Sequence, residues 1–146
     1  MHIESVTLSN FRCFGPDPTT VNLGPEVTAL IGANGAGKSA FIEALRRLFG
    51  ATKAERTLTF ADIHFGPKEK PEETETKQVV IDVVFAFPEL DGSSDDDAHR
   101  TVPEVFRIMT ASGPGEPLRA RLRLEAKWTR GEATLTISKH MSIGSC

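Results

Sequence analysis

Residues 32–39 are Gly-Ala-Asn-Gly-Ala-Gly-Lys-Ser, and they follow the apolar run Val27–Ile31. The eight residues match the phosphate-binding P-loop pattern G-x-x-x-x-G-K-[ST], which requires a strand before it and a helix after it. The three glycines lack the Cβ atoms that would block tight turns, so successive backbone N–H groups can point toward a phosphate. The stretch therefore predicts nucleotide binding.

The predicted site extends from the loop into the helix that follows it. The N-terminus of that helix adds partial positive charge. The Lys38 amine is expected to reach the β- and γ-phosphates, and the Ser39 hydroxyl is expected to be a Mg²⁺ ligand. The predicted nucleotide contacts are Gly32, Asn34, Gly35, Ala36, Gly37, Lys38, Ser39 and Ala40.

The segments next to the loop predict an α/β fold. Val27–Ile31 is so continuously apolar that we expect a strand buried on both faces. After the loop, apolar side chains recur at helical spacing, and Gly50 stands where a helix C-cap glycine belongs. The expected apolar stripe of this helix holds Phe41, Leu45, Leu48 and Phe49.

Alternation of apolar and polar residues predicts further strands. A strand at residues 2–9 and a short one at Val21–Leu23 are expected before the loop. After residue 78, strands are expected at 79–87, 105–109, 118–128 and 134–137. The stretches 68–77 and 91–97 are polar and are expected to be solvated loops. These strands predict an antiparallel β meander that follows the P-loop strand and helix in one lobe.

Composition sets limits on the function. The chain has 146 residues, a formal net charge of −3 and 39% apolar residues, which is typical of one soluble domain. No apolar run reaches the ~20 residues of a membrane span, and no signal-peptide pattern opens the chain. Cys13 and Cys146 form no metal-binding spacing. We therefore expect a reduced, cytoplasmic protein with no membrane partner.

Asn34 and the opening of the chain resemble one class of P-loop protein. The form G-x-N-G-x-G-K-S is similar to the ATP-binding-cassette (ABC) ATPases, above all to heads of the structural-maintenance-of-chromosomes (SMC) kind. A strand followed by Ser-Asn-Phe-Arg-Cys-Phe at residues 9–14, then a short strand and the P-loop, is also their N-terminal layout. This resemblance covers residues 1–50. It implies an α/β lobe of ABC/SMC-head type that holds ATP and Mg²⁺ through residues 34–39.

The same resemblance places Arg12 near the nucleotide phosphates, where a guanidinium suits bidentate contact. The competing interpretation of Arg12 is an exposed arginine that ends a strand. Phe11 and Phe14 are expected in the core. Residues 56–65, Arg-Thr-Leu-Thr-Phe-Ala-Asp-Ile-His-Phe, look like a segment of the overcoming-lysogenisation-defect (OLD) nucleases, which join such a head to a TOPRIM nuclease. We assign no catalytic role to Asp62 or His64, and expect His64 to be a hydrogen-bonded structural residue.

Other parts of these ATPases do not match this sequence. No strand of four apolar residues ends in Asp-Glu (Walker B), and there is no Ser-Gly-Gly signature segment or TOPRIM carboxylate set. Pro88 argues against a central strand at 87–91, Gln78 opens a strand, and Asp95–Asp97 lies in a polar loop. Residues 1–146 are therefore expected to be one incomplete N-terminal lobe of a longer ATPase acting on DNA, with little hydrolysis of its own.

Two functions stay open, and two classes are excluded. The first is the ATP-binding lobe of an OLD/SMC-like ATPase in DNA processing, repair or phage defence, completed by self-association or a partner subunit. The alternative is a non-hydrolysing, nucleotide-responsive module that pairs with a separate ATPase or nuclease subunit. A GTPase is excluded because no Asn-Lys-x-Asp segment is present. A kinase is excluded because Arg119, Arg121 and Arg123 follow one strand face and are expected not to converge on one phosphate.

That basic strand face, which also includes Lys127, has two interpretations. It could contact a DNA backbone in the full assembly. We favour a solvated face, because no exposed aromatic residues alternate with the basic ones and the chain is net acidic.

Overall fold

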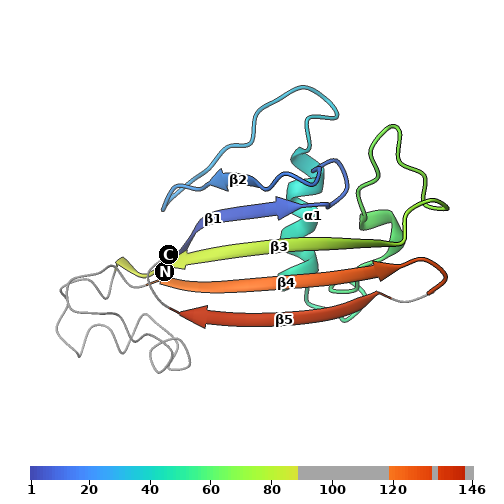
Figure 1. Cartoon of the computed structure of the whole chain (residues 1–146). Helices are drawn as coiled ribbons and strands as arrows, with labels where there is room; N and C mark the ends of the chain where they lie inside the picture. Colours follow the sequence, from blue (N-terminus) through green and yellow to red (C-terminus); the bar gives the residue numbers. More distant parts are fainter. Residues whose placement is uncertain (89–118, 133–134, 144–146) are drawn as a thin grey trace.

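Five strands form one antiparallel sheet, and a single α-helix among the described residues covers one of its faces (Figure 1). The computed structural model describes residues 1–88, 119–132 and 135–143. The spatial order of the strands is β2-β1-β3-β4-β5. The elements are β1 (His2–Ser9), β2 (Thr19–Asn22), α1 (Lys38–Phe49), the 3₁₀ helix η1 (Phe60–Asp62), β3 (Thr76–Ala86), β4 (Arg119–Thr129) and β5 (Thr136–Ile143). The meander predicted after residue 78 is confirmed for β3, β4 and β5, whereas the predicted strand 105–109 and loop 91–97 lie outside the described residues.

The register of β3 and β4 explains the strong alternation in their sequences. The two strands pair without a break from Thr76↔Thr129 to Ala86↔Arg119. Residues at alternate positions face the helix, and the residues between them face the opposite side. The apolar side chains on the helix side are buried: Val6 and Leu8 of β1, Val79, Ile81, Val83 and Phe85 of β3, and Ala120, Leu124, Ala126 and Trp128 of β4.

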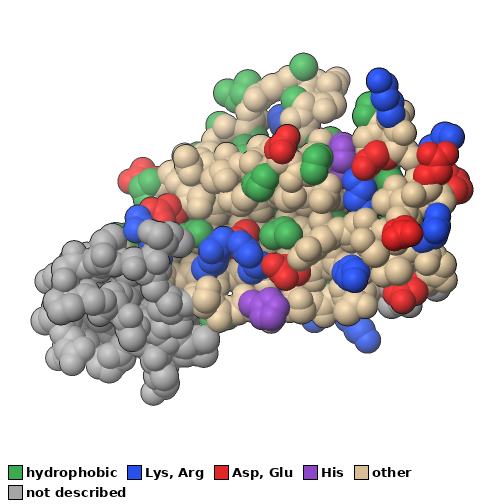
Figure 2. Space-filling view, in the orientation of Figure 1, with side chains coloured by type: hydrophobic (Ala, Val, Ile, Leu, Met, Phe, Trp, Pro, Cys, Tyr) green, Lys and Arg blue, Asp and Glu red, His purple; other side chains and the backbone are tan. Residues whose placement is uncertain are grey.

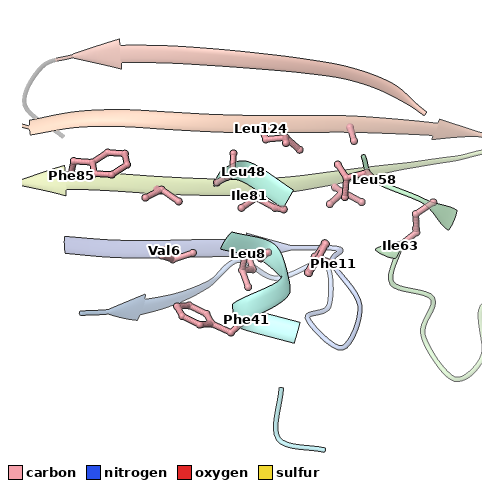
Figure 3. Close-up of a cluster of buried hydrophobic side chains, with 14 of the residues drawn as sticks. Val6, Leu8, Phe11, Phe41, Leu48, Leu58, Ile63, Ile81, Phe85 and Leu124 are labelled. Atoms are coloured by element: carbon pink, nitrogen blue, oxygen red, sulfur yellow. The ribbon is translucent and has the colours of Figure 1, made fainter. Parts of the chain in front are cut away.

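Helix α1 packs on this apolar face through a stripe centred on Ala44 (Figure 3). Ala40, Phe41, Ala44 and Leu48 are its buried residues. Ala44 is fully buried in this stripe. The predicted stripe is therefore displaced: Leu45 is only partly buried, and Phe49 is 46% exposed with its ring edge-on to Phe85 at 6.0 Å.

Gly50 ends α1, as predicted, but for a different reason from the usual one. Its N–H group donates to the Arg46 carbonyl at 2.8 Å, while its backbone is extended (φ −52°) and not left-handed. A Cβ atom at this position would lie 2.5 Å from the Glu55 Cβ atom. The position requires glycine because the following turn folds back against it.

The buried strand predicted at residues 27–31 is wrong. The segment has no regular secondary structure, and Val27 and Ile31 are 88% and 93% exposed. The chain from β2 to α1 stands away from the sheet edge in Figure 1, and no described strand pairs with it. A strand needs such pairing, because unpaired backbone groups gain nothing from becoming extended and buried. Instead, the Gly24 N–H group donates to the Thr28 hydroxyl at 2.8 Å and closes a local turn.

Candidate nucleotide-binding site

The P-loop leads into the start of α1, and two of its glycines have a left-handed backbone conformation. Gly35 has φ +84° and Gly37, the N-cap of the helix, has φ +93°. The first helical hydrogen bond joins the Phe41 N–H group to the Gly37 carbonyl at 2.9 Å. The N–H groups of the first three helix residues therefore have no helical acceptor. Such a group of donors at the positive end of a helix is suited to a phosphate.

Lys38 lies across the loop. Its amine donates to the carbonyl oxygens of Gly32 at 2.6 Å and Ala33 at 2.8 Å. The ammonium charge is therefore held inside the loop, next to the donors that begin α1. The Gly32 carbonyl oxygen thus helps to hold the Lys38 side chain in position.

A cleft of about 350 Å³ brings the predicted residues together. Its lining consists of Arg12, Cys13, Asn34, Gly35, Gly37, Lys38, Ser39 and Ala40. Of the predicted set, only Gly32 and Ala36 lie outside this lining, and Ala36 lines an adjoining apolar pocket with Phe14 and Phe41. Cys13 was not predicted, although its place directly after Arg12 was the available signal.

Arg12 reaches the cleft because the chain after β1 makes a strained, well-bonded turn. Asn10 and Arg12 both have positive φ angles, 52° and 50°. The Asn10 N–H group donates to the Gly15 carbonyl at 2.8 Å, and its side-chain amide donates to the Gln78 carbonyl on β3 at 2.9 Å. The turn is therefore fixed by the sheet and presents residues 12–14 to the P-loop.

The turn and the P-loop are in direct contact. A Cβ atom added at Gly37 would lie 3.1 Å from the Cys13 Sγ atom and 3.3 Å from the Phe14 ring. Phe11 is fully buried and Phe14 is packed against the core, so the prediction that both are core residues is confirmed.

Asp62 is a second site feature that the sequence analysis missed, besides Cys13. Its side chain is fully buried, and it accepts hydrogen bonds from the guanidinium groups of Arg12 and Arg47 and from the Thr59 N–H group, at 2.9–3.0 Å. Burial by itself would raise the pKa of Asp62, but these donors outweigh it and hold the pKa below its ordinary value. The sequence did carry a signal, since Thr59-Phe60-Ala61-Asp62 matches the capping-box pattern of a helix start.

His64 supports the same turn through its ring. Its Nδ1 atom lies 2.6 Å from the Arg12 carbonyl oxygen, and its N–H group donates to the Asn10 carbonyl at 2.9 Å. The prediction that His64 is a hydrogen-bonded structural residue is confirmed. Among the residues that the structure describes, no group of three or more His, Cys, Asp or Glu side chains could hold a metal ion.

The cleft fits a Mg²⁺-nucleotide from one side only. Ser39 supplies a hydroxyl to the lining, but none of the lining residues in the described part of the chain is a carboxylate. Glu43, one helical turn further on, lies in a separate shallow pocket with Lys38 and Ser39. The arrangement can therefore bind phosphates, but it offers no carboxylate in contact with them to order an attacking water.

The basic face of β4 is largely neutralised by carboxylates. Arg119 pairs with Glu4 at 2.7 Å, and Asp82 accepts hydrogen bonds from both Arg121 (2.8 Å) and Arg123 (2.7 Å). We expected that Arg119, Arg121 and Arg123 would not converge on one phosphate; Arg121 and Arg123 do reach a single carboxylate oxygen of Asp82, whereas Arg119 pairs with Glu4. In Figure 2, which views the sheet face opposite α1, basic, acidic and apolar side chains are interspersed. This mixture favours the solvated interpretation of the face over a continuous track for DNA.

Comparisons with known proteins agree with this geometry. A family model described as "AAA ATPase domain" matches residues 1–133. Chromosome partition protein Smc of Xanthomonas oryzae is 34% identical over 86 residues, which cover 56% of this chain and 7% of that protein. DNA double-strand break repair Rad50 ATPase of Halobacterium salinarum is 36% identical over 76 residues, covering 44% of this chain and 8% of that protein. The chain thus spans a small fraction of the length of these curated relatives.

A solved structure shows the same fold. It is described as "Structural biochemistry of ATP-driven dimerization and DNA stimulated activation of SMC ATPases", and it matches with a TM-score of 0.55 at 18% identity. The match covers 99% of this chain and 73% of the other. The predicted fold class, an α/β P-loop lobe of SMC-head type with an antiparallel sheet, is confirmed. No helix of the described residues is long and apolar enough to cross a membrane.

Proposed function

The chain belongs to the AAA ATPase domain family, and on that premise we propose that it binds ATP and Mg²⁺ as one lobe of an SMC-like ATPase head. The loop at residues 32–39 and the first turn of α1 hold the phosphates, with Lys38 as the charged contact. Ser39 supplies the Mg²⁺ ligand, and Arg12 adds a second positive charge from the opposite wall. All these residues belong to one N-terminal lobe, residues 1–146, of a larger ATPase domain.

One observation carries the proposal: two segments far apart in sequence converge on the same cleft. Arg12 lies after β1, while Lys38, Ser39 and Ala40 begin α1, and all four line the cleft. If the glycine-rich turn had no role in binding, a second cation from a distant segment would not be expected beside it. Two cations and the unpaired N–H groups of a helix start make a site for a polyanion.

The lobe holds the nucleotide but does not hydrolyse it efficiently alone. Phosphoryl transfer depends on groups placed around the γ-phosphate and on an ordered water. The cleft lining of described residues has no carboxylate for that task. We therefore propose that self-association or a partner subunit completes the site.

The exposed side of the P-loop supports such completion. Val27, Ile31 and Ile42 are large apolar residues that are 88%, 93% and 55% exposed, and all three lie in or beside the P-loop segment. Exposed apolar groups gathered in one region mark surfaces that bind other protein. Residues 56–65 support an OLD-type assembly acting on DNA, in repair or phage defence, as the full context of the lobe.

The experiment is a comparison of nucleotide affinity between two lysine variants. Binding of a fluorescent ATP analogue with Mg²⁺ is titrated for the wild type, Lys38→Ala and Lys53→Ala. Lys53 is an exposed lysine beyond the other end of α1, so it controls for loss of charge. We expect Lys38→Ala to weaken binding by at least about tenfold, equivalent to 1.4 kcal/mol, and Lys53→Ala to leave it unchanged. Equal affinities for all three proteins would refute ATP binding at the P-loop.

A second measurement tests the incomplete site. ATP turnover by the 146-residue chain is expected to be negligible. Robust turnover that disappears in Lys38→Ala would contradict the need for a second lobe or subunit.

The same apolar surface favours one alternative function. In it, the chain is a non-hydrolysing module whose bound nucleotide controls association with a separate ATPase or nuclease subunit. This alternative predicts that ATP changes the chain's association with that subunit while turnover stays absent, even in the complex.

A further inference from the structure

Asp62 joins three parts of the molecule that surround the nucleotide cleft. Its side chain is 0% exposed. Oδ1 accepts from Nε and Nη2 of Arg12, both at 2.9 Å, and Oδ2 accepts from Nε of Arg47 at 2.9 Å. The Thr59 N–H group donates to Oδ2 at 3.0 Å. One buried carboxylate therefore ties the turn after β1 to α1 and to η1.

The backbone of Arg12 is held by the same segment. Its N–H group donates to the Asp62 carbonyl at 2.8 Å, and its own carbonyl oxygen lies 2.6 Å from the His64 ring nitrogen. These bonds fix a residue whose φ angle of 50° is costly for an arginine. Both the position and the direction of the Arg12 side chain are thus set by residues 62–64.

The contacts leave one edge of the guanidinium for a ligand. Asp62 occupies the Nε–Nη2 edge, and Nη1 has no hydrogen-bond partner among the described residues. The Arg12 side chain is 33% exposed and lines the cleft. A guanidinium that is anchored on one edge and open on the other presents its remaining donors in a fixed direction.

The local charges are balanced without the nucleotide. Arg47 is held by Asp62 and by Glu43 at 3.0 Å, while Arg12 lies 3.7 Å from Glu43. Arg46 also pairs with Glu43 at 3.8 Å and with Glu55 at 2.9 Å, so three arginines face three carboxylates. The added charge of phosphates is met by Lys38 and by the open edge of Arg12, and not by Arg47, which is 12% exposed.

We propose that Asp62 is a positioning residue for nucleotide binding: it orients Arg12 toward the phosphates before the nucleotide arrives. This inference rests on the proposed function, since it requires ATP in the cleft. An arginine already fixed by Asp62 loses less rotamer freedom on binding than a free one. Without the Asp62 carboxylate, the Arg12 side chain is still present but is no longer oriented toward the cleft.

The chain offers a matched control. Asp82 on β3 is 3% exposed and is also held by two arginines, Arg121 and Arg123. It lies on the sheet face opposite α1 and is absent from the lining of the cleft. Asp62→Asn and Asp82→Asn therefore remove the same charge from similar surroundings, and only the first lies next to the site.

The test is a double-mutant comparison of nucleotide affinity. Titration with the fluorescent ATP analogue and Mg²⁺ compares wild type, Asp62→Asn, Asp82→Asn, Arg12→Ala and Arg12→Ala/Asp62→Asn, each checked for folding by circular dichroism. We expect Asp62→Asn to weaken binding about fivefold to tenfold, the scale of one lost side-chain ordering. Asp82→Asn is expected to stay within about twofold of wild type, and Asp62→Asn is expected to add no further loss once Arg12 is alanine.

Each other outcome overturns the inference. If Asp62→Asn lowers the nucleotide affinity equally in the wild-type and Arg12→Ala backgrounds, Asp62 acts on the fold alone. A loss as large in Asp82→Asn has the same meaning. Unchanged affinity in Arg12→Ala, with Lys38→Ala still impaired, removes Arg12 and Asp62 from the site but leaves the P-loop function standing. If Asp62→Asn does not fold, Asp62→Glu takes its place in the same comparison, because its longer side chain keeps the charge but displaces the carboxylate from Arg12.

Discussion

Gly35 and Gly37 have the same left-handed backbone conformation but different surroundings. Alanine at each position therefore separates the cost of that backbone conformation from the cost of a steric clash. Both φ angles, +84° and +93°, disfavour any residue with a Cβ atom, by about 1–2 kcal/mol. At Gly35 the added atom would meet nothing within 4 Å. At Gly37 it would lie 3.1 Å from the Cys13 sulfur and 3.3 Å from the Phe14 ring. The second variant therefore adds a steric cost to the backbone cost.

The magnitudes follow from these two terms. We expect Gly35→Ala to lower the free energy of unfolding by about 1–2 kcal/mol. Overpacking adds about 1 kcal/mol or more, so Gly37→Ala is expected to cost about 2–4 kcal/mol. In a domain of this size, 1 kcal/mol corresponds to roughly 3–4 °C in Tm. Thermal unfolding followed by circular dichroism, without nucleotide, therefore distinguishes the two variants.

The steric term has its own control. Cys13→Ala removes the closest contact, so the double variant Gly37→Ala/Cys13→Ala is expected to recover about 1 kcal/mol of the loss. Equal Tm values for Gly35→Ala and Gly37→Ala, or no recovery in the double variant, would refute the argument that the turn after β1 packs against the P-loop. Nucleotide affinity should follow the same order, because Gly37 sets the direction of the first N–H groups of α1.

Three further outcomes are expected. In a Cys146→Ser background, Mg²⁺-ATP should slow alkylation of Cys13 by N-ethylmaleimide several-fold, because the thiol lines the cleft; unchanged kinetics at saturating nucleotide would place ATP elsewhere. Leu48→Ala should cost about 2–4 kcal/mol in urea unfolding, since Leu48 is 5% exposed in the core, while Ile42→Ala on the exposed face of α1 should cost under about 0.5 kcal/mol. Burial would raise the pKa of Asp82, but its arginine partners lower it below 3.8, so its contribution to stability is complete above that value and is lost as the pH falls through the lower pKa of the folded state. Asp82→Asn should therefore flatten the acid side of the stability curve, and an unchanged slope below about pH 4 would contradict the ion-pair argument.

Local patterns in the sequence were enough to predict α1 and the long strands β1, β3 and β4. The alternation in residues 118–128 and 79–87 survives as β4 and β3 because one face of each strand is buried against α1. The P-loop glycines were predictable because the pattern itself demands left-handed turns. The place of Arg12 in the cleft came from the family resemblance, since no local rule connects residue 12 to residue 38.

The errors arise where a residue's role depends on distant partners. Val27–Ile31 was expected to be buried because it is apolar, but burial also requires neighbouring strands, and the sheet of described residues ends at β2. Asp62 was given no role because its partners, Arg12 and Arg47, are 50 and 15 residues away in the chain. The capping-box spacing from Thr59 could have indicated a helix start at that point, but not the two arginines that the carboxylate holds.

The two walls of the P-loop cleft differ in how the rest of the fold supports them. On one wall, Cys13 and Phe14 follow a turn that is hydrogen-bonded to β3, and Gly37 packs against them. On the other, the segment that leads into the loop is largely exposed, and its partly buried Leu30 packs against the core. The Lys38 amine, next to both walls, donates to the loop carbonyls of Gly32 and Ala33. A partner surface that binds the exposed wall and also contacts the nucleotide should raise the affinity for ATP, because the coupling between two binding sites is reciprocal.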